Sequence, residues 1–127
     1  AQGGGVIINV IGAAAFNPEA NYMIGGSANL ALNHFSKALA KEGAKSNIRV
    51  IGVNPGPIAT ERLERRIEGR PEGMSREDFL RAFTPLGRPG KPEEVADLIA
   101  FLASDRAAFM TGTNMTIDGG ANPAIMG

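Results

Sequence analysis

The sequence has no cysteine and only one histidine, and these two absences remove several classes of function. Without cysteine the chain can form no disulfide, no thiolate nucleophile and no cysteine-ligated metal site. His34 alone cannot build a histidine-rich metal cluster, so we expect no metal. Because disulfides belong to oxidising compartments, the lack of cysteine also leads us to expect a cytoplasmic protein.

Long apolar runs and an excess of one charge are also missing. No run approaches the roughly 20 residues that a membrane-spanning helix needs, so we expect no membrane association. Thirteen basic residues balance thirteen acidic ones, which leaves no overall field to attract nucleic acid. What remains is a chain of 127 residues, 43% of them hydrophobic, which is enough for one globular core.

Two apolar runs and the segment between them predict a strand, a helix and a second strand. Residues 6–11 (VIINVI) and 48–53 (IRVIGV) are continuous and apolar, a pattern typical of parallel strands that are buried on both faces. Residues 24–42 predict a long amphipathic helix that ends at Gly43. Its predicted buried face consists of Leu32, Phe35, Ser36 and Leu39.

The second half of the chain predicts a polar excursion, a helix and a last strand. Residues 61–88 predict two short charged helices, the second capped by Ser75. A segment this polar is more typical of a movable lid or a surface excursion than of the protein core. Pro92 opens a further helix, and residues 113–118 (TNMTID) predict a short strand. The predicted buried stripe of that helix is Val95, Leu98, Ile99 and Leu102.

This order of elements predicts an α/β fold, namely the C-terminal half of a doubly wound, Rossmann-type parallel sheet in three α/β/α layers. Three parallel strands would leave one sheet edge and an apolar face uncovered. The chain also starts at Ala1, directly before a strand. We therefore expect an upstream half of the same protein, a partner chain, or both, to complete the sheet.

Four segments in order resemble the short-chain dehydrogenase/reductase family, and the likeness covers almost the whole chain without gaps. The C-terminal signature is similar to that of 3-oxoacyl carrier-protein reductases. The segments are Gly5–Gly12 (GVIINVIG), Asn54–Thr60 (NPGPIAT), Pro85–Ala96 (PLGRPGKPEEVA), and Phe101–Asp105 (FLASD) with Gly112–Thr113 and Ile117–Gly120 (IDGG).

The resemblance implies that residues 1–127 are part of an NAD(P)-binding Rossmann-type domain. They would supply its last three strands, two long helices and a substrate loop at 57–88. The glycine-rich dinucleotide loop of such folds is absent, and with it the residue that chooses between NAD and NADP. The implied function is NAD(P)-dependent oxidation or reduction of a small carbonyl or alcohol substrate.

Family members use a serine that binds the substrate oxygen, a tyrosine that acts as acid or base, and a lysine four residues after the tyrosine. The gapless likeness places Gly12, Gly25 and Asn29 at these three positions, with the family spacings of thirteen and four residues intact. We therefore expect the backbone of the family active site at these three positions, without the usual side chains. Glycine at position 12 leaves a space that could admit a bulkier substrate or a water.

Tyr22 precedes Gly25 by three residues, so its ring is expected to lean toward the space that Gly25 leaves empty. Aligning Tyr22 itself with the family tyrosine would turn the helix stripe by about 60°, which disfavours that shift. Tyr22 could act as a hydrogen-bond donor to the substrate, or it could simply pack at the start of the helix. Both readings remain open.

The resemblance also implies cofactor contacts. The amide of Asn29 could bind ribose hydroxyls or only pack within the helix. Pro55, Gly56 and Ile58 would form the wall and backbone contacts of the nicotinamide, or only a turn. Thr60 would bind a phosphate or the carboxamide, or only cap the helix that follows it.

Two further expectations concern function and assembly. The alternative to an active oxidoreductase is a catalytically silent member that binds a dinucleotide or has a structural role. From the family we expect a homo-oligomer, either a dimer or a tetramer. The arginines of the lid could meet an acidic substrate group, but their alternation with acids favours a solvated helix face; they are Arg62, Arg65 and Arg66.

Overall fold

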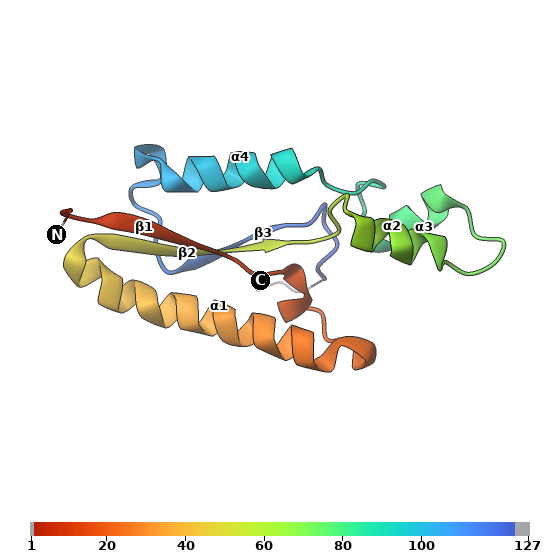
Figure 1. Cartoon of the computed structure of the whole chain (residues 1–127), viewed down its shortest axis with the longest axis horizontal. Helices are drawn as coiled ribbons and strands as arrows, with labels where there is room; N and C mark the ends of the chain where they lie inside the picture. Colours follow the sequence, from red (N-terminus) through yellow and green to blue (C-terminus); the bar gives the residue numbers. More distant parts are fainter. Residues whose placement is uncertain (1, 124–127) are drawn as a thin grey trace.

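A computed structural model describes residues 2–123 of the chain. Its centre is a parallel sheet in which β2 (Ile48–Pro55) pairs with β1 (Gly5–Val10) on one side and with β3 (Thr113–Ile117) on the other. Helix α1 (Met23–Gly43) covers one face and α4 (Pro92–Ala103) covers the other (Figure 1). The predicted α/β/α architecture with a parallel sheet is confirmed.

Helix α1 ends at Gly43, as predicted, but Gly43 itself does not turn the chain toward β2. Gly43 has a right-handed helical φ of −59°, and the chain continues through a 3-10 turn at Ala44–Ser46. The chain reverses at Asn47, which has a left-handed φ of 55°. Asparagine tolerates this conformation because its side chain can bond nearby backbone, and here Asn47 Nδ2 donates to the carbonyl of Gly3 at 3.0 Å.

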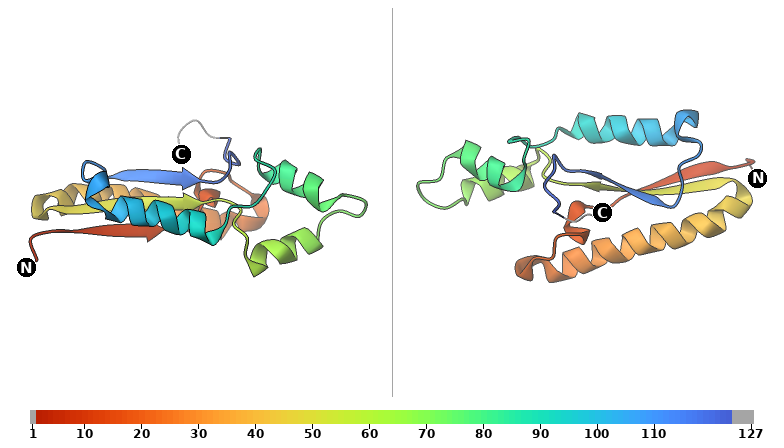
Figure 2. Two further views of the ribbon diagram at one scale, coloured as in Figure 1. Left: turned by 90° about the horizontal axis from the view of Figure 1, so that it is seen from above. Right: turned by 180° about the vertical axis from the view of Figure 1, so that it is seen from behind.

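The lid consists of α2 (Glu61–Glu68) and α3 (Arg76–Phe83), which project beyond the carboxyl ends of the strands (Figures 1 and 2). The predicted cap is confirmed, because the hydroxyl of Ser75 accepts from the backbone N–H of Asp78 at 3.0 Å. The two helices share a small apolar core separate from that of the sheet. Its buried members are Leu63, Ile67, Phe79 and Leu80.

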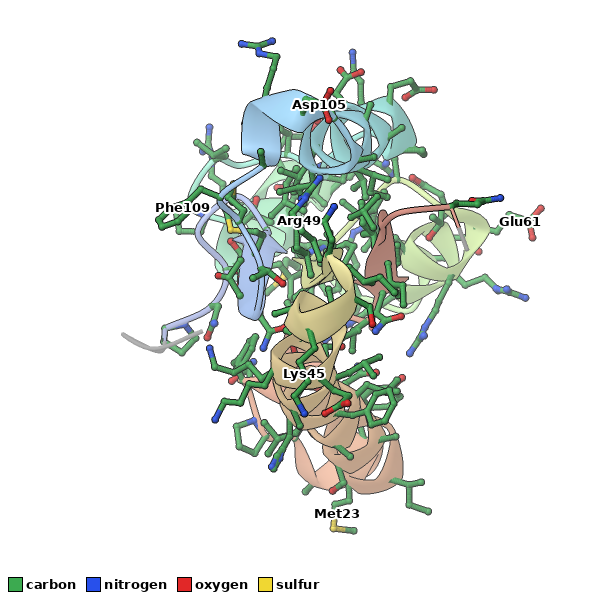
Figure 3. The ribbon with its side chains drawn as sticks, turned by 90° about the vertical axis from the view of Figure 1, so that its left-hand side faces the viewer. Met23, Lys45, Arg49, Glu61, Asp105 and Phe109 are labelled. Atoms are coloured by element: carbon green, nitrogen blue, oxygen red, sulfur yellow. The ribbon has the colours of Figure 1, made fainter. Side chains whose placement is uncertain are left out.

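The α4 face of the sheet is apolar, as predicted. Leu102 is fully buried, Val95 is nearly so, and Leu98 and Ile99 pack against them. Arg49 reaches from β2 to the far end of α4 and donates to the carbonyls of Leu102, Ser104 and Met110 at 2.9, 3.2 and 3.3 Å (Figure 3). A cation at this position satisfies carbonyls that a helix end leaves free.

The α1 face is polar. The predicted buried face of this helix is right for Ser36, partly right for Leu39 and wrong for Leu32 and Phe35. Leu32 and Phe35 are 47% and 56% exposed, whereas Asn33, Ser36 and Ala40 are buried against the sheet. Apolar spacing selected leucine and phenylalanine, but the strands present amide side chains on this face, and these amides form hydrogen bonds with polar side chains of the helix.

Within residues 2–123, no helix combines the length and apolar character needed to cross a membrane.

Candidate functional site

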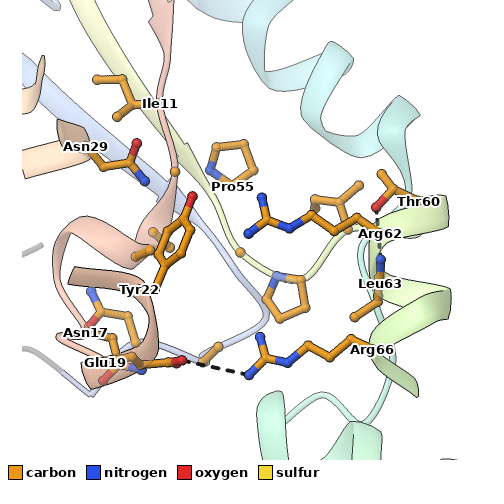
Figure 4. Close-up of a pocket in the computed structure, with 18 residues that line it drawn as sticks. Ile11, Asn17, Glu19, Tyr22, Asn29, Pro55, Thr60, Arg62, Leu63 and Arg66 are labelled. Atoms are coloured by element: carbon orange, nitrogen blue, oxygen red, sulfur yellow. Dashed lines mark hydrogen bonds and ion pairs between the residues drawn. The ribbon is translucent and has the colours of Figure 1, made fainter. Parts of the chain in front are cut away.

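A cleft of about 360 Å³ opens at the carboxyl ends of the strands (Figure 4). One wall comes from the end of β1, two 3-10 turns (Ala13–Ala15 and Ala20–Tyr22) and the first turns of α1. The other comes from the turn after β2, from α2 and from the loop after β3. Ligands of open α/β sheets bind at this end of the strands, because the loops there converge around one crevice.

Tyr22 occupies the space above Gly25. A Cβ atom built on Gly25 would overlap the ring carbons of Tyr22, so the ring lies where any larger side chain at position 25 would begin. Tyr22 lines the cleft directly before the first residue of α1, whereas Gly25 lies beneath the ring. The structure thus places the phenol of Tyr22 in the cleft, with its ring at the Cβ position of residue 25.

Gly12 and Asn29 are fitted to each other in the same way. Gly12 has a φ of 151°, which an L side chain rarely adopts. A Cβ built on it would lie 2.9 Å from Asn29 Nδ2. Both residues line the cleft beside Tyr22. A serine at position 12 would therefore meet backbone strain and the amide of Asn29 together.

These contacts show that the predicted positions lie close to one another or to Tyr22, and that each glycine leaves room for a neighbouring side chain. Gly25 makes room for Tyr22, and Gly12 makes room for Asn29. Restoring a tyrosine at position 25 would produce a clash with the ring of Tyr22 unless Tyr22 were removed as well.

The turn after β2 is fixed by two backbone hydrogen bonds to Gly90, which leave the N–H and C=O of Ile58 without a backbone partner within residues 2–123. The N–H of Ala59 donates to Gly90 at 2.8 Å, and the N–H of Gly90 donates to Pro57 at 2.9 Å. These bonds use the neighbours of Ile58, whose own N–H and C=O bond no other residue within 2–123. A free amide edge of this kind can hold a carboxamide.

Of the two roles that the sequence left open for Thr60, the structure shows the helix cap, and the ligand role stays a prediction. The hydroxyl of Thr60 accepts from the backbone N–H of Leu63 at 3.4 Å, which makes it the N-cap of α2, and it also lines the cleft. The bond is long, and a hydroxyl has a further lone pair and a proton to offer to a ligand. Pro55, Gly56 and Ile58 line the same wall.

The arginines of α2 are all exposed to solvent, but they differ in their relation to the cleft. Leu63 and Ile67 turn toward α3, and helix geometry then directs the adjacent i, i+4 pair, Arg62 and Arg66, toward the cleft. Arg65 is exposed and lies outside the cleft. The expectation of a solvated face is therefore confirmed for all three arginines, and Arg62 and Arg66 differ from Arg65 in also lining the cleft.

Sequence reasoning also missed cleft residues that come from irregular segments. Asn17 and Glu19 lie in the turns before α1, and Ala121 and Asn122 follow β3. Glu19 approaches Arg66 at 4.0 Å across the cleft (Figure 4). No periodic pattern could signal them, because their positions depend on turns rather than on a helix or strand. No group of three potential metal ligands converges anywhere in residues 2–123.

Comparison with known proteins gives the same assignment along nearly the whole chain. A family described as Enoyl-(Acyl carrier protein) reductase matches residues 1–122. A probable short-chain type dehydrogenase/reductase of Bradyrhizobium diazoefficiens is 38% identical over 120 residues, a match that covers 94% of this chain and 41% of that protein.

Solved structures of similar proteins superpose on nearly the whole chain. L-Sorbose reductase from Gluconobacter frateurii, in complex with NADPH and L-sorbose, superposes with a TM-score of 0.86 at 33% identity, covering 98% of this chain and 49% of that one. A 7α-hydroxysteroid dehydrogenase in complex with NADH gives 0.82 at 30% identity, covering 98% and 47%. The chain thus spans about half the length of these relatives, and it belongs to the short-chain dehydrogenase/reductase family.

Proposed function

We propose that the whole protein is an NAD(P)-dependent oxidoreductase of a carbonyl or alcohol substrate, and that residues 1–127 form the C-terminal half of its Rossmann-type domain. The observation that carries this proposal is the placement of the Tyr22 ring over Gly25, inside the cleft. This placement distinguishes the chain from one in which the catalytic tyrosine was lost and no other phenol lies in the cleft.

Tyr22 is proposed to donate a hydrogen bond from its hydroxyl to the carbonyl oxygen of the substrate. A donor aimed at an oxygen that gains negative charge during the reaction lowers the barrier most where water is partly excluded. The bound nicotinamide supplies or accepts the hydride, and the protein orients the reactants.

The cofactor contacts are proposed from the free polar groups of the cleft. The side-chain amide of Asn29 bonds no other side chain or backbone group of residues 2–123 and is available to ribose hydroxyls. The backbone edge of Ile58 and the hydroxyl of Thr60 would hold the carboxamide and a phosphate. Complexes of relatives with NADPH and with NADH support an NAD(P) cofactor without choosing between the two.

We further propose that the N-terminal half of the same protein covers the free edge of β1. Ile7 and Val10 on that strand are 41% and 56% exposed, which is unusual for a strand within a parallel sheet. The exposed Leu32 and Phe35 on α1 support a homo-oligomer, a dimer or a tetramer. Light scattering of the full-length protein at micromolar concentration measures this state, and a monomer would contradict it.

The function is tested with the full-length protein, NADH or NADPH, and a panel of aldehydes and ketones, followed at the nicotinamide absorbance band. Tyr22→Phe should lower kcat roughly 10²- to 10³-fold, the usual effect of removing one donor to a developing oxyanion. His34→Gln is the matched control, because His34 lies on α1, the helix that Tyr22 precedes, but lines a different cavity. Unchanged turnover in Tyr22→Phe would contradict the role of Tyr22.

Calorimetric binding of NADH or NADPH without turnover of any carbonyl would instead support the silent alternative. In that case Gly12→Ser, Gly25→Tyr and Asn29→Lys should be combined with Tyr22→Ala, because the native ring would block a tyrosine at position 25. Activity gained by this variant would show that the scaffold still supports the chemistry. Absence of any gain would show that the loss extends beyond the three positions.

A further inference from the structure

We propose that the cleft selects substrates with an anionic group a few bonds from the reacting carbonyl, and that Arg62 binds this group. The inference rests on the proposed function of Tyr22, because it places the anion relative to that residue. It names a substrate class, the oxo acids, that is more specific than carbonyl or alcohol.

Arg62 points from α2 across the cleft toward Tyr22 (Figure 4). Its Cζ lies 5.3 Å from the centroid of the Tyr22 ring, within the range of a cation–π contact. This contact places the guanidinium at the cleft beside the Tyr22 ring, while the residue as a whole remains exposed. Any carbonyl oxygen bound by the hydroxyl of Tyr22 would therefore lie close to a fixed positive charge.

No carboxylate of residues 2–123 lies within ion-pair distance of Arg62. Arg66 differs, because it approaches Glu19 at 4.0 Å and lies over the ring of Phe83 at 4.2 Å. Arg62 thus has its planar fork of N–H donors free on the cleft side, and such a fork matches a carboxylate in bidentate geometry.

The charges that line the cleft leave it net positive. Glu19 contributes one negative charge, and Arg62 and Arg66 contribute two positive charges, so the balance is +1. The proposed cofactor would add its own negative phosphates to this cleft, so the preference rests on the guanidinium of Arg62 beside Tyr22. No carboxylate of residues 2–123 pairs with it, and an anionic group on the substrate could do so.

The short distance between Arg62 and Tyr22 limits the spacing of the two groups on the substrate. A 2-oxo or 3-oxo acid can place its carbonyl at Tyr22 and its carboxylate at Arg62 together, whereas a long-chain acid cannot. An oxyanion could also come from the cofactor as a phosphate. We assign Arg62 to the substrate because its contact is with Tyr22, and the experiment separates the two sources.

The test uses the full-length protein and matched pairs of an acid and its neutral amide, namely acetoacetate with acetoacetamide and phenylglyoxylate with phenylglyoxylamide. Wild type should prefer each acid roughly 10- to 100-fold in kcat/KM, the range expected for hydrogen bonds to a charged group. Arg62→Gln should lose this preference by slowing the acids alone, and Arg62→Lys should retain part of it. Arg65→Gln, on the same helix but outside the cleft, should behave as wild type.

The same pairs are titrated calorimetrically into the protein saturated with NADPH, so that the preference is measured whether or not turnover occurs. Equal or undetectable binding of acid and amide overturns the inference. A higher KM for NADPH in Arg62→Gln, with an unchanged acid-to-amide ratio, also overturns it, because it assigns Arg62 to a cofactor phosphate. Preferential binding of the acids without turnover overturns the proposed reaction alone and leaves the anion site standing.

Discussion

The two faces of the sheet are held to their helices by different kinds of contact. Against α4 the sheet presents Ile51 and Val53, both fully buried, which pack on apolar side chains. Against α1 the sheet presents the amides of Asn9 and Asn54, which form hydrogen bonds with Ser36 and Asn33 of the helix. Apolar packing depends on volume and tolerates small shifts, whereas hydrogen bonds depend on direction. The polar face is also the one whose helix carries Asn29 and follows Tyr22.

The amides of the α1 face form a connected set. Asn33 and Asn54 exchange two side-chain hydrogen bonds of 2.8 Å, both residues being buried. Asn33 also donates to the carbonyl of Asn29 at 2.9 Å, and Asn9 donates to Ser36 at 2.8 Å. Because Asn54 directly precedes the Pro55 turn, the pair links the helix that bears Asn29 to the wall proposed to hold the nicotinamide. This set fixes the register of α1 on the sheet.

The largest effect is expected on the apolar face. Leu102→Ala removes a fully buried side chain from the contact between α4 and the sheet and should lower the free energy of unfolding by about 2–5 kcal/mol. Denaturant unfolding of the full-length protein measures it. Phe101→Ala is the control on the same helix, since Phe101 is 39% exposed and should cost less. Equal losses for the two variants would contradict the assignment of Leu102 to the core.

The amide pair should give a smaller but coupled effect. Asn33→Ala or Asn54→Ala leaves the other amide buried without its partner and should cost about 1–3 kcal/mol. The double variant removes both amides, so its cost should be less than the sum of the single costs. A double-mutant cycle by denaturant unfolding measures the coupling, and strictly additive costs would show that the pair does not act as a unit.

The same contrast explains how far the sequence could predict the fold. The stripe of α4, with Val95 and Leu102, was correctly predicted because apolar spacing signals apolar burial. For α1 the same rule chose Leu32 and Phe35, which are exposed, since a helix buried through amides carries no apolar signal. Hydrogen-bond partners such as Asn54 lie on distant strands, and spacing along the helix cannot reveal them.

The candidate site divides in a similar way. The spacing of Gly12, Gly25 and Asn29 marks a set of positions, and the structure brings them together with Tyr22. Arg62 was expected on a solvated helix face and is exposed, but the alternation of charges could not show that it also lines the cleft. Its direction depends on the packing of α2 against α3, which local sequence does not encode.

Ser36→Ala should weaken the polar face by about 1 kcal/mol, less than loss of the amide pair. It removes the hydroxyl that accepts from Asn9 Nδ2, but alanine keeps the helix and fills nearly the same volume. The neighbouring Lys37→Ala serves as the control, because Lys37 is exposed and bonds only the carbonyl of Gly112. Thermal unfolding at one buffer composition compares the two, and a larger loss in Lys37→Ala would contradict the contribution of the Asn9 contact.

The smallest effect is expected at the exposed start of α4, where Arg88 pairs with Glu94 at 2.8 and 2.9 Å. The hydrogen bonds from Arg88 and then from the backbone of Lys91 lower the pKa of Glu94 from 4.5 to about 2. Because the folded pKa lies below the unfolded one, the ionised pair stabilises the fold above pH 4.5, and this contribution is lost as the pH falls toward 2.

Glu94→Gln should therefore differ most from wild type near neutral pH, and the difference should shrink as the pH falls from 4.5 toward 2. The difference should stay below that of the buried contacts, because both partners are about half exposed and water screens their attraction. Chemical unfolding across this pH range measures it, with Glu93→Gln on the same turn as the control. A gap that widened on acidification would reverse the expected sign and show that the pair does not stabilise α4.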